Sequence, residues 1–470
     1  MTTYTQKPHK FNPTILREYD IRGIVDENVT ADDAFAIGCA FGTMVKRRAK
    51  DDRPQTVAVG YDGRETSPIY ADAVTQGLMS TGVNVTWIGL GPSPMLYFAV
   101  KSRKEDAGIM ITGSHNPSNY NGFKMSFLNE AVYGDRVQEV GRIAQSADYE
   151  QGNGSKTEID VSEDYLNRIL SDLDTDKEFN IVWDNGNGAA GNLLKRLTDK
   201  IPGKHHLLYE EVDANFPNHH PDPTVDKNLQ DLIKKVAEES ADFGIAFDGD
   251  ADRIGVVNNK GDILRCDVLM AIYAKDVLKA QPNAPIVGDI KCSKVMFDEI
   301  NALGGQAVMW KTGHSLIKTK MLELNAPLAG ELSGHIFFAD KYYGYDDALY
   351  CSVRLINAIA HSGKTLAEMT AHMPQLYSTP EIRFEVDEAT KFDSVTALVQ
   401  NVKDTATDGI DVNDTDGVRV STEDGWWLVR ASNTQNALSA RAEATSPEGL
   451  ERLKEMIQTH VKKIGYTVPF

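Results

Sequence analysis

The chain has 470 residues, of which 41% are hydrophobic and 25% are charged. This length exceeds what one hydrophobic core supports, and the composition is that of a folded globular protein, so about three or four domains are expected. The formal net charge of −19 argues against the broad basic surface that nucleic acids and anionic membranes require.

The cysteines are scattered along the chain and form no CxxC pair: Cys39, Cys266, Cys292 and Cys351. In a long chain this usage is typical of reduced, buried thiols and not of a disulfide framework. The opening segment, MTTYTQKPHKFNP, has no apolar run of the kind found in a signal peptide, and no later stretch is long enough to span a membrane. We therefore expect a cytoplasmic protein whose partners include neither a membrane nor a nucleic acid.

Three segments share one plan, in which a β-rich apolar run ends at an aspartate and a helical pattern follows: residues 56–74, 180–197 and 284–300. Further strand-like runs follow these units, at 83–90, 107–112, 241–248, 306–313 and 326–338. Continuous apolar strands that alternate with amphipathic helices predict α/β domains with largely buried sheets. The unusual loops follow the carboxyl ends of these strands, where open α/β sheets bind their ligands.

The last part of the chain has a different pattern. Apolar and polar residues alternate in EIRFEVD, GVRVSTEDGWWLVRASNT and ALSARAEAT, and a helical pattern covers 447–463. This predicts a small antiparallel α+β domain. We accordingly divide the chain into three α/β domains and one α+β domain, with the bounds 1–159, 160–262, 263–373 and 374–470.

The first unusual loop is ITGSHNPSNYNGFK, residues 111–124, in which Ser114 and His115 stand among turn-forming residues. From the residues alone, Ser114 is either a nucleophile that carries a transferred group or part of a turn. Lys124 ends this segment, and Arg22 lies in the earlier segment REYDIRG. Each is either a cation that balances an anionic ligand or an ordinary surface charge.

The strongest motif is FDGDADR, residues 247–253, which directly follows an apolar strand. Asp248, Asp250 and Asp252 place three carboxylates close together, and such groups repel one another unless a cation neutralises them. Oxygen ligands suit Mg²⁺ or Ca²⁺. An EF-hand is excluded, because its glycine and glutamate positions hold Arg253 and Asn259. The remaining alternative is a solvated acidic turn.

Two further loops offer hydrogen-bonding groups. In GELSGHIFF, Glu331 and Ser333 suit sugar hydroxyls, and His335 is either a proton-transfer group or a structural histidine. VRASNTQNALSARAEA predicts either a hairpin turn or a phosphate cradle. The groups of that cradle would be Arg430, Ser432, Asn433, Thr434 and Arg441.

Three other cations, Lys291, Lys311 and His314, could also balance an anionic ligand, although each one alone is more often a surface charge. By contrast, we interpret NFPNHHPDP as a rigid connecting loop. Its adjacent residues His219 and His220 point apart in an extended chain, and no third ligand has a suitable spacing, so a zinc site is not predicted.

Taken together, YDIRG, TGSHNP, DGDADR, GELSGH and RASNT resemble the α-D-phosphohexomutase family, most closely its bacterial phosphomannomutase/phosphoglucomutase branch. The resemblance spans nearly the whole chain and keeps the order and spacing of the motifs. It implies four domains around a central cleft, three of them related mixed-sheet α/β domains. One departure is Asn436, which stands where the family commonly has proline, and the phosphate loop is therefore expected to be less rigid.

The resemblance also implies the roles of the residues. Ser114 would carry the phosphoryl group, and Asp248, Asp250, Asp252 and a phosphoserine oxygen would bind Mg²⁺. Arg22, Lys124 and His335 would assist proton transfer or stabilise charge. The substrate would be held by Tyr19, Arg253, Lys291, His314, Glu331, Ser333, His335, Arg430, Ser432, Asn433, Thr434 and Arg441.

The implied reaction interconverts hexose 1-phosphate and 6-phosphate through a bound 1,6-bisphosphate, with glucose or mannose 1,6-bisphosphate as activator. The local context WKTGHSLIK favours mannose and glucose over glucosamine, which is the alternative sugar. Two other functions are weighed against this one, a non-catalytic phosphosugar binder of the same fold and a metal-dependent phosphatase. No segment is typical of an oligomerisation helix, so a monomer is expected.

Overall fold

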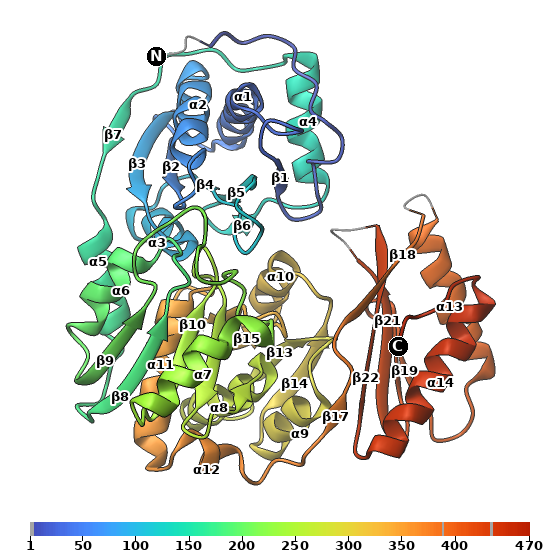
Figure 1. The fold of residues 1–470 in the computed structure, drawn as a ribbon. Helices are drawn as coiled ribbons and strands as arrows, with labels where there is room; N and C mark the ends of the chain where they lie inside the picture. Colours follow the sequence, from blue (N-terminus) through green and yellow to red (C-terminus); the bar gives the residue numbers. More distant parts are fainter. Residues whose placement is uncertain (1–3, 388–389, 433–435) are drawn as a thin grey trace.

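The computed structural model describes residues 4–387, 390–432 and 436–470, and its four β-sheets follow one another along the chain. Figure 1 shows the first sheet above the second and third, with the fourth to one side of the third. The expected division into three α/β parts and a C-terminal α+β part is confirmed. None of the helices in the described part of the chain combines the length and hydrophobicity that a bilayer crossing requires.

The first sheet has seven strands, and the main path runs β1-β5-β4-β2-β3-β7, with β6 beside β5. Strands β2, β3, β4 and β7 pair in parallel, whereas β5 is antiparallel to both β1 and β4. The strands are β1 (Ile21–Ile24), β2 (Thr56–Tyr61), β3 (Asn84–Leu90), β4 (Ala107–Ile111), β5 (Tyr120–Phe127), β6 (Glu130–Ala131) and β7 (Lys156–Glu158). The helices are α1 (Ala31–Arg48), α2 (Ser67–Ser80), α3 (Ser93–Arg103) and α4 (Asp135–Ser146).

The second sheet has the order β12-β11-β10-β8-β9, in which β8, β9 and β10 are parallel and the other two strands antiparallel. Its strands are β8 (Phe179–Asp184), β9 (Gly203–Leu208), β10 (Phe243–Phe247), β11 (Ile254–Asn258) and β12 (Ile263–Leu264). Helices α5 (Ser162–Leu170), α6 (Gly191–Thr198), η1 (Asp226–Leu229) and α7 (Gln230–Glu238) accompany it. The amphipathic helix α6 buries Leu193, Leu194 and Leu197, which lie on one helical face.

The third sheet has the order β14-β13-β15-β16, with only β16 antiparallel to its neighbour. Its strands are β13 (Pro285–Asp289), β14 (Gln306–Trp310), β15 (Leu328–Gly330) and β16 (Ile336–Phe338). The helices are α8 (Cys266–Ala280), α9 (Lys294–Ala302), α10 (His314–Leu324), α11 (Ala348–Ser362) and α12 (Leu366–Thr370). One hydrophobic core joins this part to the second sheet and to α3 of the first.

The C-terminal sheet is antiparallel throughout, with the path β17-β22-β21-β20-β19 and β18 beside β22. Its strands are β17 (Tyr377–Ser378), β18 (Ile382–Glu385), β19 (Asp411–Asn413), β20 (Val418–Ser421), β21 (Gly425–Ala431) and β22 (Ala437–Ala444). Helices α13 (Lys391–Thr405) and α14 (Pro447–Lys463) pack on it, and this part has a hydrophobic core of its own. A small apolar cluster of Ile290, Trp426 and Leu428 joins it to the third sheet.

Candidate active site

Ser114 follows β4, and its hydroxyl faces the acidic loop of the second sheet. Oγ donates to Oδ2 of Asp248 over 3.0 Å and lies 3.2 Å from Nδ1 of His115. The Ser114 side chain is buried, and its backbone has a φ of 49°, in the left-handed region that few non-glycine residues adopt. Strained backbone of this kind clusters at functional sites, so the geometry supports a functional loop over an ordinary turn.

A buried arginine that the sequence analysis did not single out holds this loop in place. Arg64 donates through Nη2 to the carbonyl oxygen of Ser114 over 2.9 Å and through Nη1 to that of Tyr120 over 3.0 Å. It also donates to the carbonyl oxygens of Asn116 and Pro117, over 2.6 and 2.5 Å. The one sequence feature that points to Arg64 is its place in the triplet DGR, which follows an apolar strand. The loops that carry Ser114, Asp248 and Glu331 also follow apolar strands.

The three aspartates of the acidic loop converge in the interior. Asp248, Asp250 and Asp252 are at most 1% exposed, and one carboxylate oxygen of each lies within 4.8 Å of the others. Burial, followed by the charges of Asp252 and Asp250, raises the pKa of Asp248 well above its usual range. Oδ1 of Asp250 is buried and has no hydrogen-bond partner among the described residues. Clustered oxygen donors with one atom left unpaired fit a hard divalent cation, so this triad could hold a metal ion.

Lys124 and Gly249 both help to position the three aspartates. Nζ of Lys124 donates to Oδ2 of Asp250 over 2.7 Å and to Oδ2 of Asp252 over 2.5 Å. Gly249 passes so close to the first domain that an added Cβ would lie 2.5 Å from the carbonyl oxygen of Ser114. Only glycine allows this approach, which places the serine and the aspartates side by side.

His335 joins the acidic loop to the GELSGH loop, which connects β15 to β16. Its Nε2 lies 3.1 Å from Oδ1 of Asp252, and its Nδ1 lies 3.0 Å from Oε2 of Glu331 and 3.2 Å from Oγ of Ser333. Burial alone would lower the pKa of His335, but the charge of Asp252 and the hydrogen bonds to Asp252 and Glu331 together outweigh it and raise the pKa to about 9. This histidine is therefore a cation held between two carboxylates.

The loop between β14 and α10 connects three domains. The backbone carbonyl of Thr312 accepts a hydrogen bond of 2.9 Å from the hydroxyl of Tyr19 in the first domain. Its backbone N–H donates over 3.0 Å to Oδ2 of Asp416, in the C-terminal domain. The same carboxylate oxygen accepts from Nε of Arg430 over 2.9 Å. The next residue, Gly313, donates its backbone N–H to Oε1 of Glu331 over 2.6 Å, so this loop ties the predicted phosphate cradle to the predicted sugar site.

Three other predicted cations, Arg22, Arg253 and His314, lie near the serine loop or near His335. Arg22 donates to Oδ1 of Asn116 over 2.7 Å, beside the serine loop, and Nε of Arg253 lies 3.4 Å from Nε2 of His335. The ring of His314 lies 5.9 Å from that of Tyr19 and 5.5 Å from that of His335. The structure thus brings Tyr19, Arg22, Ser114, Lys124, Asp248, Asp250, Asp252, Arg253, His314, Glu331, Ser333 and His335 into one connected region.

Two of the remaining predicted residues, Lys291 and Arg441, meet at the junction of the third and C-terminal domains. Arg441 donates to the carbonyl oxygen of Lys291 over 2.8 Å, and Nζ of Lys291 lies 3.9 Å from Oε2 of Glu381. Ser432 is buried, whereas Lys311 is exposed. Asn433 and Thr434 lie outside the described residues.

His219 and His220 belong to neither of the two groups of clustered metal-ligating side chains in the described part of the chain. Nε2 of His219 lies 2.9 Å from Oδ2 of the buried Asp184, and its Nδ1 lies 3.0 Å from the carbonyl oxygen of His220. This pairing fixes the loop in which both histidines stand. It also gives His219 a structural partner that the sequence analysis did not identify.

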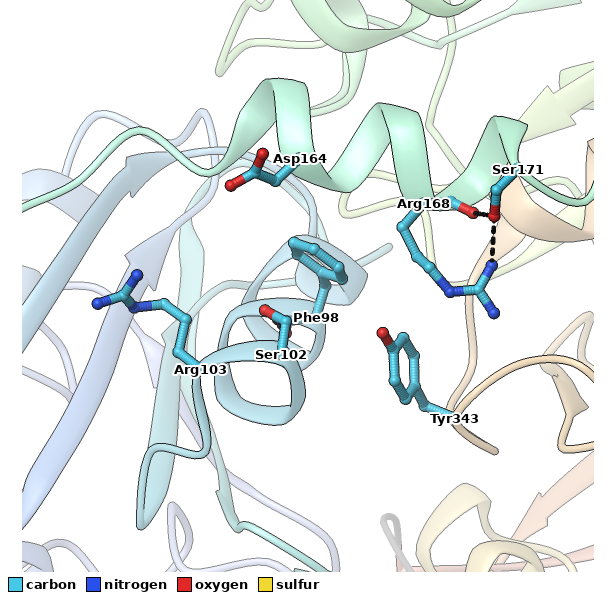
Figure 2. Close-up of a pocket in the computed structure, with 7 residues that line it drawn as sticks. All are labelled: Phe98, Ser102, Arg103, Asp164, Arg168, Ser171 and Tyr343. Carbon is cyan, nitrogen blue, oxygen red and sulfur yellow. Dashed lines mark hydrogen bonds between the residues drawn. The ribbon is translucent and has the colours of Figure 1, made fainter.

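A separate cavity of about 590 Å³ lies between α3, α5 and the loop after β16. Figure 2 shows its seven lining residues, among them Arg168 hydrogen bonded to Ser171. Arg168 also pairs with Asp172 over 3.0 Å, and Arg103 lies 3.1 Å from Glu105. Both guanidinium groups already have a carboxylate partner, which reduces the positive charge that this cavity offers to an anion.

Comparison with known families matches four family models along the chain. Residues 13–150, 163–261 and 265–377 match the phosphoglucomutase/phosphomannomutase alpha/beta/alpha domains I, II and III, and residues 381–460 match the C-terminal domain of that family. These four ranges correspond in order to the four sheets.

Several known proteins are similar to this chain over nearly its whole length. A phosphomannomutase/phosphoglucomutase of Pseudomonas aeruginosa is 41% identical over 465 residues, which cover 99% of each chain. A phosphoglucomutase of Neisseria gonorrhoeae is 37% identical, over 95% of this chain and 96% of the relative. The crystal structure of a phosphoglucomutase/phosphomannomutase family protein from Burkholderia thailandensis superposes with a TM-score of 0.91 at 38% identity, covering 98% of this chain and 100% of the other.

Proposed function

This chain belongs to the phosphoglucomutase/phosphomannomutase family, and from that premise we propose that it is a phosphohexomutase acting on mannose and glucose phosphates. The observation that carries the proposal is the 3.0 Å contact between Oγ of Ser114 and the buried aspartate triad. The relatives that are 37 to 41% identical bear the names phosphomannomutase/phosphoglucomutase and phosphoglucomutase. An N-acetylphosphoglucosamine mutase of Aspergillus fumigatus is only 14% identical and supports the shared fold alone.

In the proposed reaction, a phosphoryl group carried on Oγ of Ser114 passes to a hydroxyl oxygen of a hexose phosphate. The bond from phosphorus to Oγ breaks, a bond to the sugar oxygen forms, and the hydroxyl proton moves to a basic side chain. The resulting 1,6-bisphosphate turns around, and its other phosphoryl group returns to Ser114. Such transfer depends mainly on positioning and charge neutralisation. Lys124 and His335, which both contact the triad, are our candidates for proton transfer. Each is a cation in the resting site, so it must first release a proton to a neighbouring carboxylate before it accepts the hydroxyl proton, and Arg22 stabilises charge at the hydroxyl.

We propose Mg²⁺ as the metal ion, held by Asp248, Asp250, Asp252 and an oxygen on phosphorylated Ser114. The unpaired Oδ1 of Asp250 and the all-oxygen donor set support this choice. When bound, the ion offsets negative charge on the group that is transferred. Glucose or mannose 1,6-bisphosphate would act as activator by phosphorylating Ser114.

For the substrate, we propose that Glu331 and Ser333 bind sugar hydroxyls and that Arg430 and Ser432 bind the phosphate that is not transferred. Among the described residues, the buried Nη2 atom of Arg430 has no hydrogen-bond partner, and a phosphate oxygen would satisfy it. Asn433 and Thr434 would complete this cradle. The other proposed substrate contacts are Tyr19, Arg253, Lys291, His314, His335 and Arg441.

Three further predictions remain proposals. The first is that the domain boundaries lie after residues 159, 262 and 373. The second is a monomer. The third is a cytoplasmic location, which the four free, buried cysteines support because a reducing compartment keeps thiols unpaired.

The test combines phosphate mapping with a product assay. The protein is incubated with Mg²⁺ and glucose 1,6-bisphosphate, phosphate is located by peptide mass mapping, and turnover of mannose, glucose and glucosamine 1-phosphates is compared, with Ser114→Ala as control. We expect phosphate on Ser114 alone and faster turnover of the first two sugars. An unmodified Ser114 in folded, metal-bound protein would favour the non-catalytic binder. Free phosphate in excess of isomerised product would favour the phosphatase, and preference for glucosamine would favour the phosphoglucosamine mutase.

A further inference from the structure

One buried carboxylate beside the proposed site has not been assigned a role. Asp346 is 0% exposed and lies in the loop between β16 and α11, where a β-bridge to Phe337 fixes its backbone. Its Oδ1 accepts a hydrogen bond of 3.0 Å from Nζ of Lys318. Its Oδ2 is buried and has no hydrogen-bond partner among the described residues. Burying a carboxylate with only one of its oxygens hydrogen bonded costs free energy of folding, so an unpaired buried oxygen such as this one indicates a role.

Nδ1 of His314 lies 3.6 Å from this unpaired oxygen. That nitrogen is also buried and has no hydrogen bond within the described ranges. His314 and Lys318 lie four residues apart on α10, so their side chains project from one face of the helix, and both meet Asp346. The two unpaired atoms therefore face one another, and each is the partner that the other lacks.

This juxtaposition determines where the imidazole proton lies. An ionised carboxylate only accepts hydrogen bonds, and an imidazole nitrogen without a proton also only accepts. Two such atoms 3.6 Å apart and shielded from water would repel each other, whereas a proton on Nδ1 makes the contact attractive. Burial, together with the charges of Lys318 and His335, lowers the pKa of His314 well below its usual range, which favours the neutral ring with a single proton.

We infer that Asp346 is a positioning residue, which holds the neutral His314 ring with its proton on Nδ1 and so presents Nε2 as a hydrogen-bond acceptor. The ring lies between those of Tyr19 and His335, within the region of the predicted site residues. A bare Nε2 accepts from a hydroxyl but repels a phosphate oxygen. We therefore assign a sugar hydroxyl of the hexose phosphate, and not the phosphate group, as the partner of Nε2 of His314. This assignment rests on the proposed function.

The first experiment needs no substrate. Full-length protein labelled with ¹⁵N-histidine is examined by two-bond ¹H–¹⁵N correlation spectroscopy, and the signals of His314 are assigned by their loss in His314→Gln. We expect the pattern of a neutral ring with a protonated Nδ1 and a bare Nε2. A proton on Nε2, an even mixture of the two tautomers or a charged ring would overturn the inference.

The second experiment inverts the tautomer. In Asp346→Asn the amide oxygen should turn to Lys318, which only donates, and the amide NH₂ should turn to Nδ1 of His314 and force the proton onto Nε2. The matched control is Asp347→Asn, which makes the same charge change at the next residue. Asp347 contacts Tyr165 and Tyr342 instead, so the control should leave the His314 pattern unchanged. An unchanged pattern in Asp346→Asn would contradict the inference, and should that variant not fold, the wild-type spectrum decides alone.

Turnover connects the tautomer to the proposed reaction. Asp346→Asn should lower kcat for glucose 1-phosphate by at least about tenfold, as expected when an imidazole presents the wrong nitrogen. In the His314→Gln background the same substitution should have little further effect, because Asp346 acts through His314. Full additivity would contradict this. A wild-type protein with the expected tautomer but no mutase activity would refute the proposed function and leave the positioning role intact.

Discussion

Arg64 and Ser114 come from different loops of the first domain, and the guanidinium of Arg64 donates to the carbonyl oxygen of Ser114 over 2.9 Å. The same side chain donates to three more carbonyl oxygens of the serine loop, at Asn116, Pro117 and Tyr120. A planar fork with five donors can serve several acceptors at once, whereas a lysine ammonium cannot reach them all. The position of the proposed nucleophile thus depends on one buried arginine.

We therefore expect Arg64→Lys to lower kcat by roughly tenfold or more and to lower the melting temperature by about 4 °C, for a loss of about 2 kcal/mol. Turnover of glucose 1-phosphate and thermal melting followed by circular dichroism measure these effects. The control is Arg53→Lys, because Arg53 is half exposed and its ion pair with Asp106 contributes little. Equal behaviour of the two variants would mean that Arg64 does not hold the loop.

The buried triad predicts a stabilising response to Mg²⁺. Removal of divalent cations by a chelator leaves three carboxylates close together, and Mg²⁺ added at a hundred times its Kd should then stabilise the protein by about 2.7 kcal/mol. Asp250→Asn keeps the shape of the side chain but removes the charge beside the unpaired oxygen, so it should abolish most of this response. Differential scanning calorimetry with and without Mg²⁺ measures it. A variant at the exposed Asp164 should respond like the wild type, and an equal response of Asp250→Asn would refute the assignment.

The junction of the third and C-terminal domains predicts a pH dependence. The nearby ammonium of Lys291 lowers the pKa of Glu381 to about 2, against burial, which raises it. Because the folded pKa lies below the unfolded value, the stabilisation is fully present above the unfolded value of about 4.5 and is lost as the pH falls towards 2. At neutral pH it amounts to roughly 3 kcal/mol at most.

Glu381→Gln should accordingly melt several degrees below the wild type at pH 7 and about as far below it at pH 5. The difference should shrink markedly by about pH 3. Melting curves of both proteins across this range test the prediction, with Glu385→Gln, on the exposed side of β18, as control. A difference that stays constant down to pH 3 would show that the charge of Glu381 contributes nothing to stability.

The sequence predicted those parts of the molecule that local patterns encode. Apolar strands followed by polar loops located the segments that carry Ser114, Asp248 and Glu331, and the structure brings these loops together. Helix α13 was not predicted, although Val395, Leu398 and Val402 have helical spacing and are buried. That signal was present but was outweighed by the alternation in the neighbouring strands.

The supporting charges could not be predicted in this way. Arg64 acts on carbonyl oxygens 50 or more positions away, and Asp416 meets Thr312 across 104 positions. Asp346 likewise stands in a loop with no motif of its own. Such contacts are set by tertiary packing, and a single charged residue in a loop has the same local sequence whether it is solvated or buried.

Asp416 leads to the last prediction, because its Oδ2 accepts both from the backbone of Thr312 and from Nε of Arg430. The carboxylate therefore aligns the guanidinium of the proposed phosphate cradle with the third domain. Asp416→Asn keeps one acceptor oxygen but removes the charge that pairs with the buried Arg430. We expect KM for glucose 1-phosphate to rise about tenfold, while kcat changes less, because the substituted residue acts on binding at the end of the sugar that does not react.

Steady-state kinetics at saturating Mg²⁺ separate the two constants. The control is Asp414→Asn, two residues away, where the carboxylate pairs with Lys403 on the surface and should not affect either constant. A fall in kcat at constant KM would place Asp416 with the transfer chemistry instead. Unchanged constants would mean that Arg430 is held without this carboxylate, and the connection between the phosphate cradle and the sugar site through Thr312 would have no functional role.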